Sequence, residues 1–294
     1  MKVLVTGSDG FVGKYIVAEL KNRKHKVIEF DKNKGKDILN KEDLRENLKG
    51  IDAVVHLAAI IDNSNSKLWE VNVNGTKKVF AEAKKARVKK FVLLSSTGVY
   101  GETKGKVSEE ILVAPENNYE KSKVAAEEIV LEKKGKMGVC VVRSAMVFGP
   151  NEYWEKMFKM LKKNFPLPCR GNNHFQVIYV QDLAEIIALV LEKGKNKETY
   201  LVSGMERLTL KEFCIQIKKE FGLKEEMKTM NSSLAALMGK IFRIKVLNSE
   251  NIRHLAKERD YDTTKIEKLG WKQKRNLKEE IIETIEMLKE ENID

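Results

Sequence analysis

The strongest constraint on the fold lies in the first 20 residues. An apolar run, Val3-Leu4-Val5, breaks into three glycines at intervals of three residues, Gly7, Gly10 and Gly13. Helical periodicity follows from Tyr15 to Leu20. In a strand–turn–helix unit that binds a dinucleotide, the first glycine permits a tight turn, the second lets the backbone approach a pyrophosphate, and the third lets the helix pack on the strand. The three glycines alone are equally compatible with an ordinary glycine-rich turn.

The residues after this turn favour dinucleotide binding. The N-terminus of the following helix would supply N–H donors and the positive end of a helix dipole to phosphates. A second strand, Lys26–Phe30, ends in Asp31, 18 residues after Gly13. A carboxylate there can accept both hydroxyls of an adenosine ribose and repels a 2′-phosphate, so the sequence predicts NAD rather than NADP as cofactor. Lys32 and Lys34 follow closely and would soften that preference.

Composition limits the class of protein. The chain has 294 residues, 42% of them apolar, which is enough for one large domain or a domain with a smaller lobe. It contains no run of about 18 apolar residues, and Met1-Lys2 leads straight into the first strand, so we expect neither a membrane span nor a signal peptide. An odd number of cysteines, Cys140, Cys169 and Cys214, argues against a disulfide framework and favours the reducing cytoplasm.

The net charge of +12 is compatible with nucleic acid or an anionic ligand as partner. The lysines, however, stand among glutamates, as in Lys41-Glu42 and Lys278-Glu279-Glu280, and no basic run is interleaved with aromatic residues. We therefore expect a solvated charged surface and no nucleic-acid partner. The four histidines have no metal-ligand spacing with each other or with the cysteines, so we expect no metal site.

Apolar strands alternate with helices through the first half of the chain. Further strand patterns lie at Ile51–Leu57, Lys90–Ser95 and Val139–Arg143, and helical patterns at Trp69–Ala86 and Tyr119–Lys133. Near-continuous apolar strands separated by helices predict an α/β fold with a doubly wound parallel sheet, a Rossmann domain, over residues 1–150.

The second half, residues 151–294, is predicted to be a smaller, mostly helical substrate lobe with segments that return to the first domain. Only Glu198–Val202 has a clear strand pattern there. Helical patterns occupy Trp154–Lys163, Leu183–Glu192, Thr209–Phe221, Leu234–Ile241 and Leu277–Lys289. We expect all three tryptophans, Trp69, Trp154 and Trp271, to be packing groups.

A candidate catalytic pair lies at the start of a predicted helix. Tyr119 and Lys123 are four residues apart and therefore share one helical face. A phenol titrates near pH ~10, and a neighbouring ammonium favours the phenolate, so Lys123 is expected to lower the pKa of Tyr119. Such a tyrosine can exchange a proton with a carbinol or a carbonyl. Ser96 ends a predicted strand, where ligands bind in parallel α/β folds, and its hydroxyl can hold a substrate oxygen.

These features in this order resemble the extended short-chain dehydrogenase/reductases, the NAD-dependent epimerase/dehydratase family. The resemblance covers nearly the whole chain. It is carried by the following motifs: Thr6-Gly7-x-x-Gly10-x-x-Gly13, His56-Leu57-Ala58-Ala59, Asn72-Val73-Asn74-Gly75-Thr76, Ser95-Ser96-Thr97-Gly98-Val99-Tyr100-Gly101, Tyr119-x-x-x-Lys123, Val180-Gln181-Asp182 and Leu269-Gly270-Trp271.

The resemblance implies a set of site residues. Ser96, Tyr119 and Lys123 are the implied catalytic residues, with Lys123 also at the nicotinamide ribose. Asp37 and Ile38 are implied at the adenine, and Asn72 is implied to brace the site. The full set of implied cofactor-binding positions is Gly7, Gly10, Phe11, Val12, Gly13, Asp31, Asp37, Ile38, Leu57, Ala58, Ala59, Asn72, Tyr119, Lys123 and Ala145.

The chain departs from the family pattern at the positions that touch substrate. Sugar-nucleotide members usually carry an asparagine where this chain has Met146, and an arginine near His174, which is followed by Phe175. Arg170 lies nearby and, with Asn172, Asn173 and His174, is a candidate substitute set for an anion. Dehydratases carry Asp-Glu after the catalytic hydroxyl, where this chain has Thr97-Gly98, so sugar dehydration is not expected.

The sequence therefore predicts NAD-dependent hydride transfer at a secondary carbinol or ketone, by an epimerase or a dehydrogenase/reductase. A nucleotide sugar and a less charged small-molecule substrate stay equally open, because Ile60–Asn63 and Glu198–Gly204 look closer to hydroxysteroid dehydrogenases and dihydroflavonol reductases. A non-catalytic NAD-sensing regulatory protein is the alternative from another class. The resemblance also implies a homodimer built on the helices Trp69–Ala86 and Tyr119–Lys133.

Overall fold

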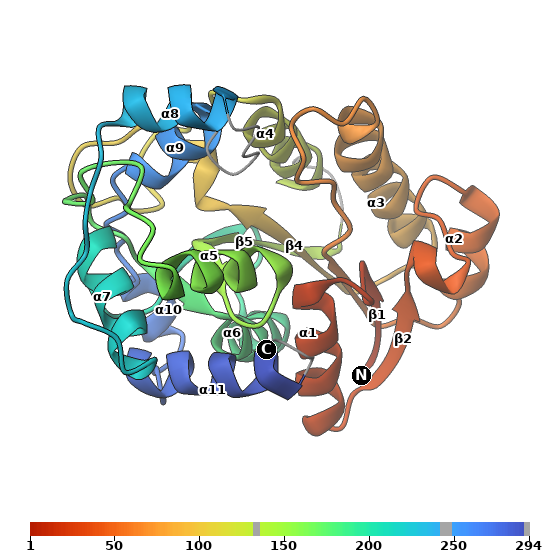
Figure 1. The fold of residues 1–294 in the computed structure, drawn as a ribbon. Helices are drawn as coiled ribbons and strands as arrows, with labels where there is room; N and C mark the ends of the chain where they lie inside the picture. Colours follow the sequence, from red (N-terminus) through yellow and green to blue (C-terminus); the bar gives the residue numbers. More distant parts are fainter. Residues whose placement is uncertain (132–135, 242–248, 291–294) are drawn as a thin grey trace.

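A six-stranded parallel sheet organises the computed structural model, which describes residues 1–131, 136–241 and 249–290 (Figure 1). The strand order is β2-β1-β3-β4-β5-β8. The strands are β1 (Lys2–Thr6), β2 (Lys26–Phe30), β3 (Ala53–His56), β4 (Lys90–Ser96), β5 (Gly138–Ser144) and β8 (Glu198–Val202). The chain moves from β1 to β2 on one side and returns to β3 on the other. This reversal of direction is where ligands bind in open α/β sheets.

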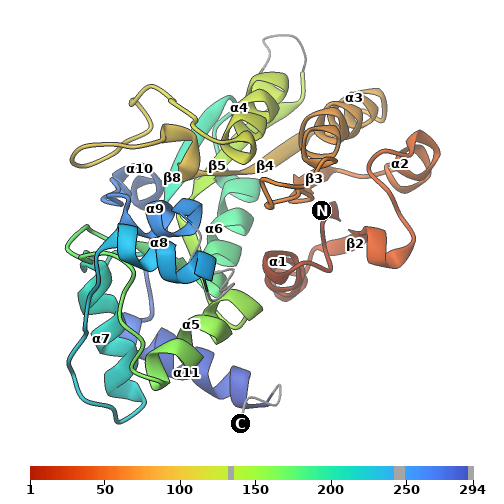
Figure 2. The same cartoon turned by 45° about the horizontal axis from the view of Figure 1, so that its top comes forward.

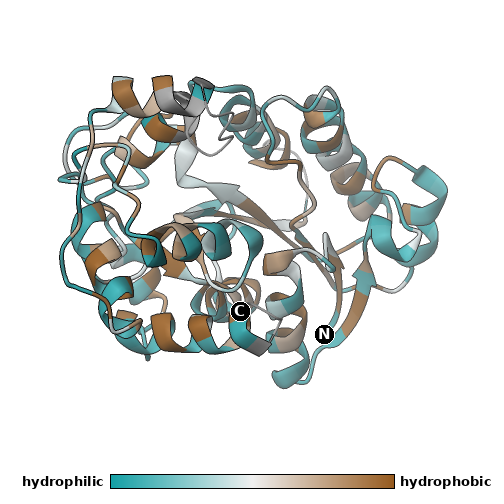
Figure 3. Ribbon diagram, viewed as in Figure 1, coloured by the Kyte–Doolittle hydropathy of each residue, from teal (hydrophilic) through white to brown (hydrophobic). Residues whose placement is uncertain are grey.

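The four central strands, β1, β3, β4 and β5, are largely apolar on both faces because helices cover both sides of the sheet, and parts of the sheet are brown in Figure 3. Along β1, Val3 and Val5 belong to one buried cluster and Leu4 to another. The helices α1 (Phe11–Asn22) and α6 (Val180–Lys193) cover the first face. The opposite face is covered by α2 (Lys41–Asn47), α3 (Thr76–Lys85) and α4 (Asn118–Leu131). The doubly wound parallel sheet predicted from the sequence is confirmed.

The helix predicted from Trp69 to Ala86 begins with a π-helical segment, η2 (Glu70–Gly75), and continues as α3. Trp69 itself is 50% exposed, so the prediction that it packs inside is wrong. The buried side of this segment runs through Leu68, Asn72 and Thr76, which leaves the neighbouring Trp69 at the surface. Trp154 and Trp271 are buried as expected. The end of the other predicted helix, at Lys133, lies outside the described residues.

A second layer forms beyond β5. Short strands β6 (Met146–Phe148) and β7 (Val177–Tyr179) pair in parallel. Around them lie α5 (Glu152–Lys162), α7 (Leu210–Glu220), α8 (Ser232–Ile241), α9 (Ser249–Ala256) and α11 (Leu277–Glu290). The short helix α10 (Thr264–Lys268) packs against β8 of the main sheet instead. Figures 1 and 2 show α5, α7, α8, α9 and α11 grouped on the side of the molecule away from α2 and α3.

An aromatic cluster holds this second layer together. The ring of Phe148 contacts those of Trp154, Phe158 and Phe213, with the Trp154 and Phe213 contacts in edge-to-face geometry. By contrast, α6 and β8 pack in the first layer, with α6 against α1 and β8 as the edge strand of the sheet. The division of the chain near residue 150 stays a prediction, with these two elements as the expected returning segments.

None of the helices in the described ranges combines the length and the apolar character needed to cross a lipid bilayer.

Candidate active site

The glycine-rich turn after β1 is shaped by close backbone contacts. Gly7 has a φ of +71°, and a Cβ there would lie 2.8 Å from the backbone nitrogen of Ala58. A Cβ on Gly13 would lie 2.1 Å from the carbonyl oxygen of Gly7. Glycine is therefore required at both positions to bring β1, β3 and α1 together. A Cβ on Gly10 would meet only the Gly7 oxygen, at 3.4 Å, so the middle of the turn is open.

This opening fits the phosphates of a dinucleotide. Gly10 caps α1 without a side-chain hydrogen bond, which leaves the first-turn N–H groups at Phe11, Val12 and Gly13 for a ligand. The hydroxyl of Ser8 is buried in the same turn and has no hydrogen-bond partner among the described residues. A buried polar atom without a partner is costly, and a polar ligand bound in this turn would supply a partner for it. The sequence analysis did not single out Ser8.

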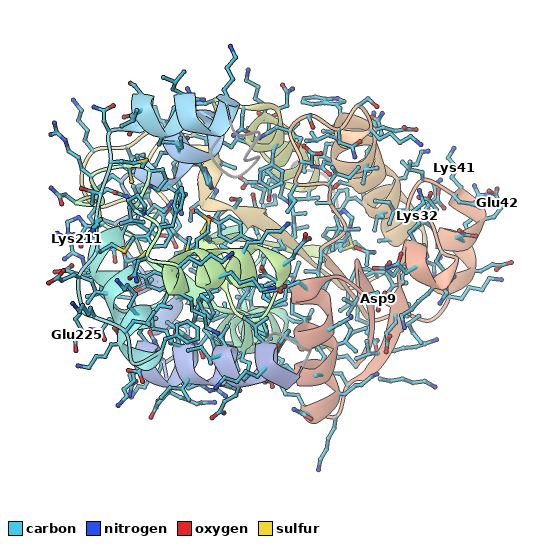
Figure 4. The ribbon with its side chains drawn as sticks, in the orientation of Figure 1. Asp9, Lys32, Lys41, Glu42, Lys211 and Glu225 are labelled. Carbon is cyan, nitrogen blue, oxygen red and sulfur yellow. The ribbon has the colours of Figure 1, made fainter. Side chains whose placement is uncertain are left out.

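The carboxylate of Asp31 lies at the end of β2, beside the turn. It accepts hydrogen bonds from the backbone N–H groups of Asp9 and Asn33, each at 3.0 Å. Asp9 and Lys32 lie on the same side of the molecule in Figure 4. Lys34, expected to soften the preference for NAD, forms a 2.9 Å ion pair with Glu29 instead.

The loop after β2 packs on the π-helical segment η2. The Asp37 carboxylate accepts a hydrogen bond of 2.8 Å from the backbone of Leu39. Ile38 is buried, and a Cβ on Gly75 would lie 2.5 Å from the Ile38 Cδ1 atom. Gly75 therefore admits Ile38, which fixes this loop at the far end of the predicted cofactor site. The contacts of Asp37 and Ile38 with adenine stay predictions.

Asn72 connects the loop after β3 to helix α4 in the predicted site. Its side chain accepts a hydrogen bond of 2.7 Å from the backbone N–H of Ile60 and donates one of 2.9 Å to the Ile60 carbonyl. It also donates a hydrogen bond of 2.9 Å to the hydroxyl of Ser122, and this hydroxyl donates one of 2.7 Å to the Tyr119 carbonyl. The buried amide is thus engaged by the protein, which fits the predicted brace. Leu57, Ala58 and Ala59 are partly exposed at the end of β3, and Ala145 follows β5.

The three candidate catalytic residues converge at the carboxyl end of β4. Ser96 ends this strand, and its side chain lies near enough to Tyr119, in the first turn of α4, to oppose a rise in the pKa of that phenol. Lys123 lies one turn further along α4 and is buried. Its ammonium donates a hydrogen bond of 2.6 Å to the carbonyl of Leu94 on β4.

Burial controls the protonation of Tyr119 and Lys123. It raises the pKa of Tyr119 to about 12, although the hydrogen bond with Ser96 opposes the shift. It lowers the pKa of Lys123 to about 8, although the nearby Glu127 carboxylate opposes that shift. The expectation that Lys123 lowers the Tyr119 pKa is therefore wrong for the protein without cofactor. The Lys123 ammonium is directed at the Leu94 carbonyl, and the loss of solvent around the Tyr119 phenol is the largest influence on its pKa.

A buried ion pair anchors α4 to the sheet below these residues. Arg143 on β5 donates to both carboxylate oxygens of Glu127, with a shortest distance of 2.7 Å, and to the hydroxyl of Tyr100 at 2.9 Å. Ser95, next to Ser96, also donates to Glu127. Because Glu127 is one turn from Lys123, the pair fixes the helix face that carries the candidate catalytic side chains.

The proposed substitute set for an anion does not converge. Arg170 and Asn172 are exposed. The amide of Asn173 donates to the carbonyls of Leu255 and Lys257, and the imidazole of His174 is bonded to Glu258. These side chains are used to hold the segment after α9, so the expectation of a common anion site on this loop is wrong.

Two residues that the sequence analysis missed lie at this end of the site. The Arg259 guanidinium lies over the ring of Phe175, 5.1 Å from its centroid, and 3.5 Å from the sulfur of Met146. The hydroxyl of Tyr261 accepts a 3.0 Å hydrogen bond from Thr97, next to Ser96. Neither residue belongs to a local sequence pattern. Arg259 is 113 residues from Met146 and Tyr261 is 164 residues from Thr97, so only the fold brings these residues together.

The chain was compared with known families and structures. The family model described as "NAD dependent epimerase/dehydratase family" matches residues 3–203. The chain belongs to this family. It is therefore an NAD-dependent enzyme, in agreement with the cofactor predicted from the sequence.

Individual relatives agree with the family. The chain is 30% identical to a dTDP-D-glucose 4,6-dehydratase of Bos taurus, over 98% of this chain and 89% of the relative. Among solved structures, the dTDP-glucose 4,6-dehydratase DesIV of Streptomyces venezuelae aligns with a TM-score of 0.81 at 24% identity, covering 99% of this chain and 97% of the other. A UDP-glucose 4-epimerase of Thermotoga maritima also has a TM-score of 0.81, at 22% identity with 99% of both chains covered. These structures support the fold.

The position of Asp31 predicts discrimination between the two cofactors. We expect the wild-type enzyme to bind NAD more tightly than NADP, and Asp31→Ala to narrow this difference by roughly tenfold or more, since hydrogen bonds to a charged group are lost and repulsion of a 2′-phosphate is removed. Titration calorimetry with both cofactors measures the effect. Asp52→Ala is the control, because Asp52 precedes β3 and so lies at the amino ends of the strands, opposite to the end where β2 leads into Asp31. Equal or tighter binding of NADP by the wild type would contradict the assignment.

The lowered pKa of Lys123 predicts pH-dependent stability. Below pH 8 the lysine is charged in both the folded and the unfolded protein, and its burial reduces the free energy of unfolding in full. As the pH rises from about 8 to 10.5, the folded state loses this proton first and the penalty disappears. Without cofactor at pH 7, Lys123→Met should therefore be more stable than the wild type, by at most roughly 3 kcal/mol.

Urea denaturation of both proteins between pH 7 and 10.5 measures this difference, which should shrink as the pH rises. Lys121→Met is the control, because Lys121 is exposed on the same helix. A destabilised Lys123→Met protein with a constant difference across the pH range would show that the hydrogen bond to Leu94 outweighs the burial of charge.

Proposed function

We propose that this enzyme transfers a hydride between NAD and a secondary carbinol or ketone carbon, as an epimerase or a dehydrogenase/reductase. The convergence of Ser96, Tyr119 and Lys123 beside the open nucleotide turn carries the proposal. Bound NAD supplies the hydride acceptor or donor. The first-turn N–H groups of α1 and the Asp31 carboxylate would hold its phosphates and adenosine ribose.

Ser96, Tyr119 and Lys123 have different proposed roles at the substrate oxygen. The hydroxyl of Tyr119 holds the proton that is exchanged with this oxygen, and Ser96 positions the oxygen through its own hydroxyl. A phenol with a pKa of about 12 keeps its proton at neutral pH, so Tyr119 is set to protonate a carbonyl oxygen during reduction. In the reverse direction Tyr119 must lose this proton, and Lys123, one turn further along α4, would supply a positive charge that favours the phenolate.

A nucleotide sugar is the substrate class that we favour. Similar proteins include a dTDP-D-glucose 4,6-dehydratase and a UDP-glucose 4-epimerase, which supports this substrate class. A less charged carbinol or ketone is the second candidate, favoured by the apolar Met146 at the substrate end.

Dehydration of the sugar does not fit the residues after Ser96. The hydroxyl of Thr97 is bonded to Tyr261, and Gly98 has no side chain. The space beside Gly98 is taken by Glu120, whose Cγ would lie 3.2 Å from a Cβ on Gly98. The Glu120 carboxylate, however, accepts hydrogen bonds from the backbone N–H groups of Glu116 and Asn117 and caps α4. These hydrogen bonds engage the Glu120 carboxylate, so epimerisation or reduction fits the residues of this site better than dehydration.

We also propose a homodimer that acts in the cytoplasm. Val79 and Phe80 are buried within the monomer, so the outer faces of α3 and α4, with Ala81, Ala125 and Glu128, would form the interface. Light scattering at micromolar concentration tests the mass, and a monomer would contradict the dimer. The three cysteines are free and buried, which fits a reducing compartment. Cell fractionation tests the location.

The proposed role of Tyr119 predicts a specific kinetic defect. Tyr119→Phe should reduce turnover by about 10²–10⁴-fold, because the proton carrier is removed, while NAD affinity changes little. Lys123→Ala should lower both turnover and NAD affinity. The measurements are steady-state kinetics on a panel of UDP-, GDP- and dTDP-sugars and neutral carbinols, with calorimetry for NAD.

Tyr200→Phe is the matched control, since the Tyr200 hydroxyl bonds to the backbone of Lys195, away from the site. Turnover by Tyr119→Phe at the wild-type rate would refute the assigned role.

A further inference from the structure

An ion pair joins the second layer to the catalytic helix beside Tyr119. Lys257 follows α9, and its side chain is only 10% exposed. Its ammonium lies 3.1 Å from a carboxylate oxygen of Glu116 and 3.4 Å from one of Glu120. Glu120 directly follows Tyr119, and its side chain is 2% exposed. The second layer therefore places a positive charge at the start of α4, next to the proposed acid–base residue.

The Glu120 carboxylate is held in place by α4 itself. One of its oxygens accepts hydrogen bonds from the backbone N–H groups of Glu116 and Asn117, at 2.7 and 3.2 Å. The Asn117 side chain in turn accepts a hydrogen bond of 2.8 Å from the Glu120 N–H, so the two residues form a reciprocal cap. The other oxygen lies near Lys257. Because the cap uses only the first oxygen, it holds the carboxylate here independently of Lys257.

Glu120 also packs against the loop that carries Ser96. A Cβ on Gly98 would lie 3.3 Å from the Ser96 hydroxyl oxygen and 3.5 Å from a Glu120 carboxylate oxygen. A negative charge at this place favours the protonated phenol. Burial raises the pKa of Tyr119, Ser96 opposes the shift, and the charge of Glu120 adds to it. Glu120 therefore works against the release of the Tyr119 proton.

The other charged side chains near Tyr119 on α4 are engaged elsewhere. The Lys123 ammonium donates a hydrogen bond to a backbone carbonyl, and Glu127 is paired with Arg143. Within the described residues, Lys257 is the cation that forms an ion pair with Glu120. The charge of Glu120 is therefore offset by a residue of the second layer.

The titratable groups next to Lys257 preserve this pairing. His254 is neutral, because burial, with Arg259 and Lys257 in support, lowers its pKa to about 3. The pKa of Glu116 is lowered, since burial opposes the shift but Lys257 and Arg253 outweigh it. The Lys257 ammonium thus faces carboxylates and has a neutral imidazole beside it.

We propose that Lys257 is a positioning residue for catalysis, which offsets the charge of Glu120 and so allows Tyr119 to release its proton. This rests on the proposed function of the same site. In the oxidation of a carbinol, the phenol first gives its proton to solvent. The phenolate then takes the hydroxyl proton of the carbinol, while the hydride passes to bound NAD.

The ionisation of Tyr119 can be measured in the NAD-bound protein without a substrate. Carbon-13 NMR of protein labelled at the tyrosine Cζ atom follows each phenol, and Tyr119→Phe identifies the Tyr119 signal. Lys257→Met should raise the pH at which Tyr119 ionises by roughly one unit, because the charge of Glu120 is then uncompensated in a buried place. Lys257→Arg keeps the positive charge and should restore most of this change.

Glu120→Gln tests the same pair from its other side. The amide oxygen can still accept the hydrogen bonds of the α4 cap, but the negative charge is removed, so the ionisation pH of Tyr119 should fall. In this background Lys257→Met should cause less than roughly half of the shift that it causes alone, because the two residues act as a unit. Lys121→Met is the matched control, since Lys121 is exposed on α4 and its loss changes the net charge equally. It should leave the Tyr119 titration unchanged.

Three results would overturn the proposal. The first is an equal shift by Lys257→Met with and without the Glu120 charge. The second is a Tyr119 phenol that stays protonated up to the pH of unfolding in the wild type and in Glu120→Gln. The third is a lower melting temperature of Lys257→Met with an unchanged Tyr119 titration, which would assign the ion pair to stability alone. The proposed function is tested apart from this by the turnover of Tyr119→Phe, because the titration uses no substrate.

Discussion

The contact between Gly13 and the carbonyl of Gly7 sets the geometry on which the site depends. With no Cβ at Gly13, α1 approaches the end of β1 so closely that a methyl group would lie 2.1 Å from a backbone oxygen. This places the first turn of α1 over the switch between β1 and β3. The Asp31 carboxylate lies beside the same turn, where it accepts a hydrogen bond from the backbone N–H of Asp9. A side chain at Gly13 would move the helix and separate these groups.

The catalytic helix α4 is held by a different kind of interaction, a series of buried polar contacts on successive turns. Ser122 bonds to Asn72, Lys123 to the Leu94 carbonyl and Glu127 to Arg143. Each contact joins α4 to a neighbouring loop or strand, so the helix has little freedom to shift along the sheet. The same burial that fixes the helix removes water from Tyr119 and Lys123. This packing therefore raises the pKa of Tyr119 and lowers that of Lys123, so that the neutral form of each side chain is favoured.

The substrate end is assembled from segments that are distant in sequence. Residues 257–262 bring Lys257 to the start of α4, Arg259 to Met146 and Tyr261 to Thr97. The backbone of this strap also pairs with the catalytic side of the molecule, where the N–H of Val107 donates to the Asp260 carbonyl at 2.8 Å. The second layer thus contributes charged and aromatic side chains directly beside the catalytic loop.

The sequence by itself determined the features that depend on local geometry. Glycine spacing fixes a turn, a four-residue interval places Tyr119 and Lys123 on one helical face, and apolar runs between helices specify a parallel sheet. Tertiary structure alone decided the burial that raises the Tyr119 pKa, the engagement of the loop around His174, the exposure of Trp69 and the arrival of Arg259 beside Met146. These depend on which distant segments meet and how much water they exclude. Periodicity and spacing describe a residue and its near neighbours in the chain, whereas the charge state and partners of a buried side chain are set by the packing of the whole fold.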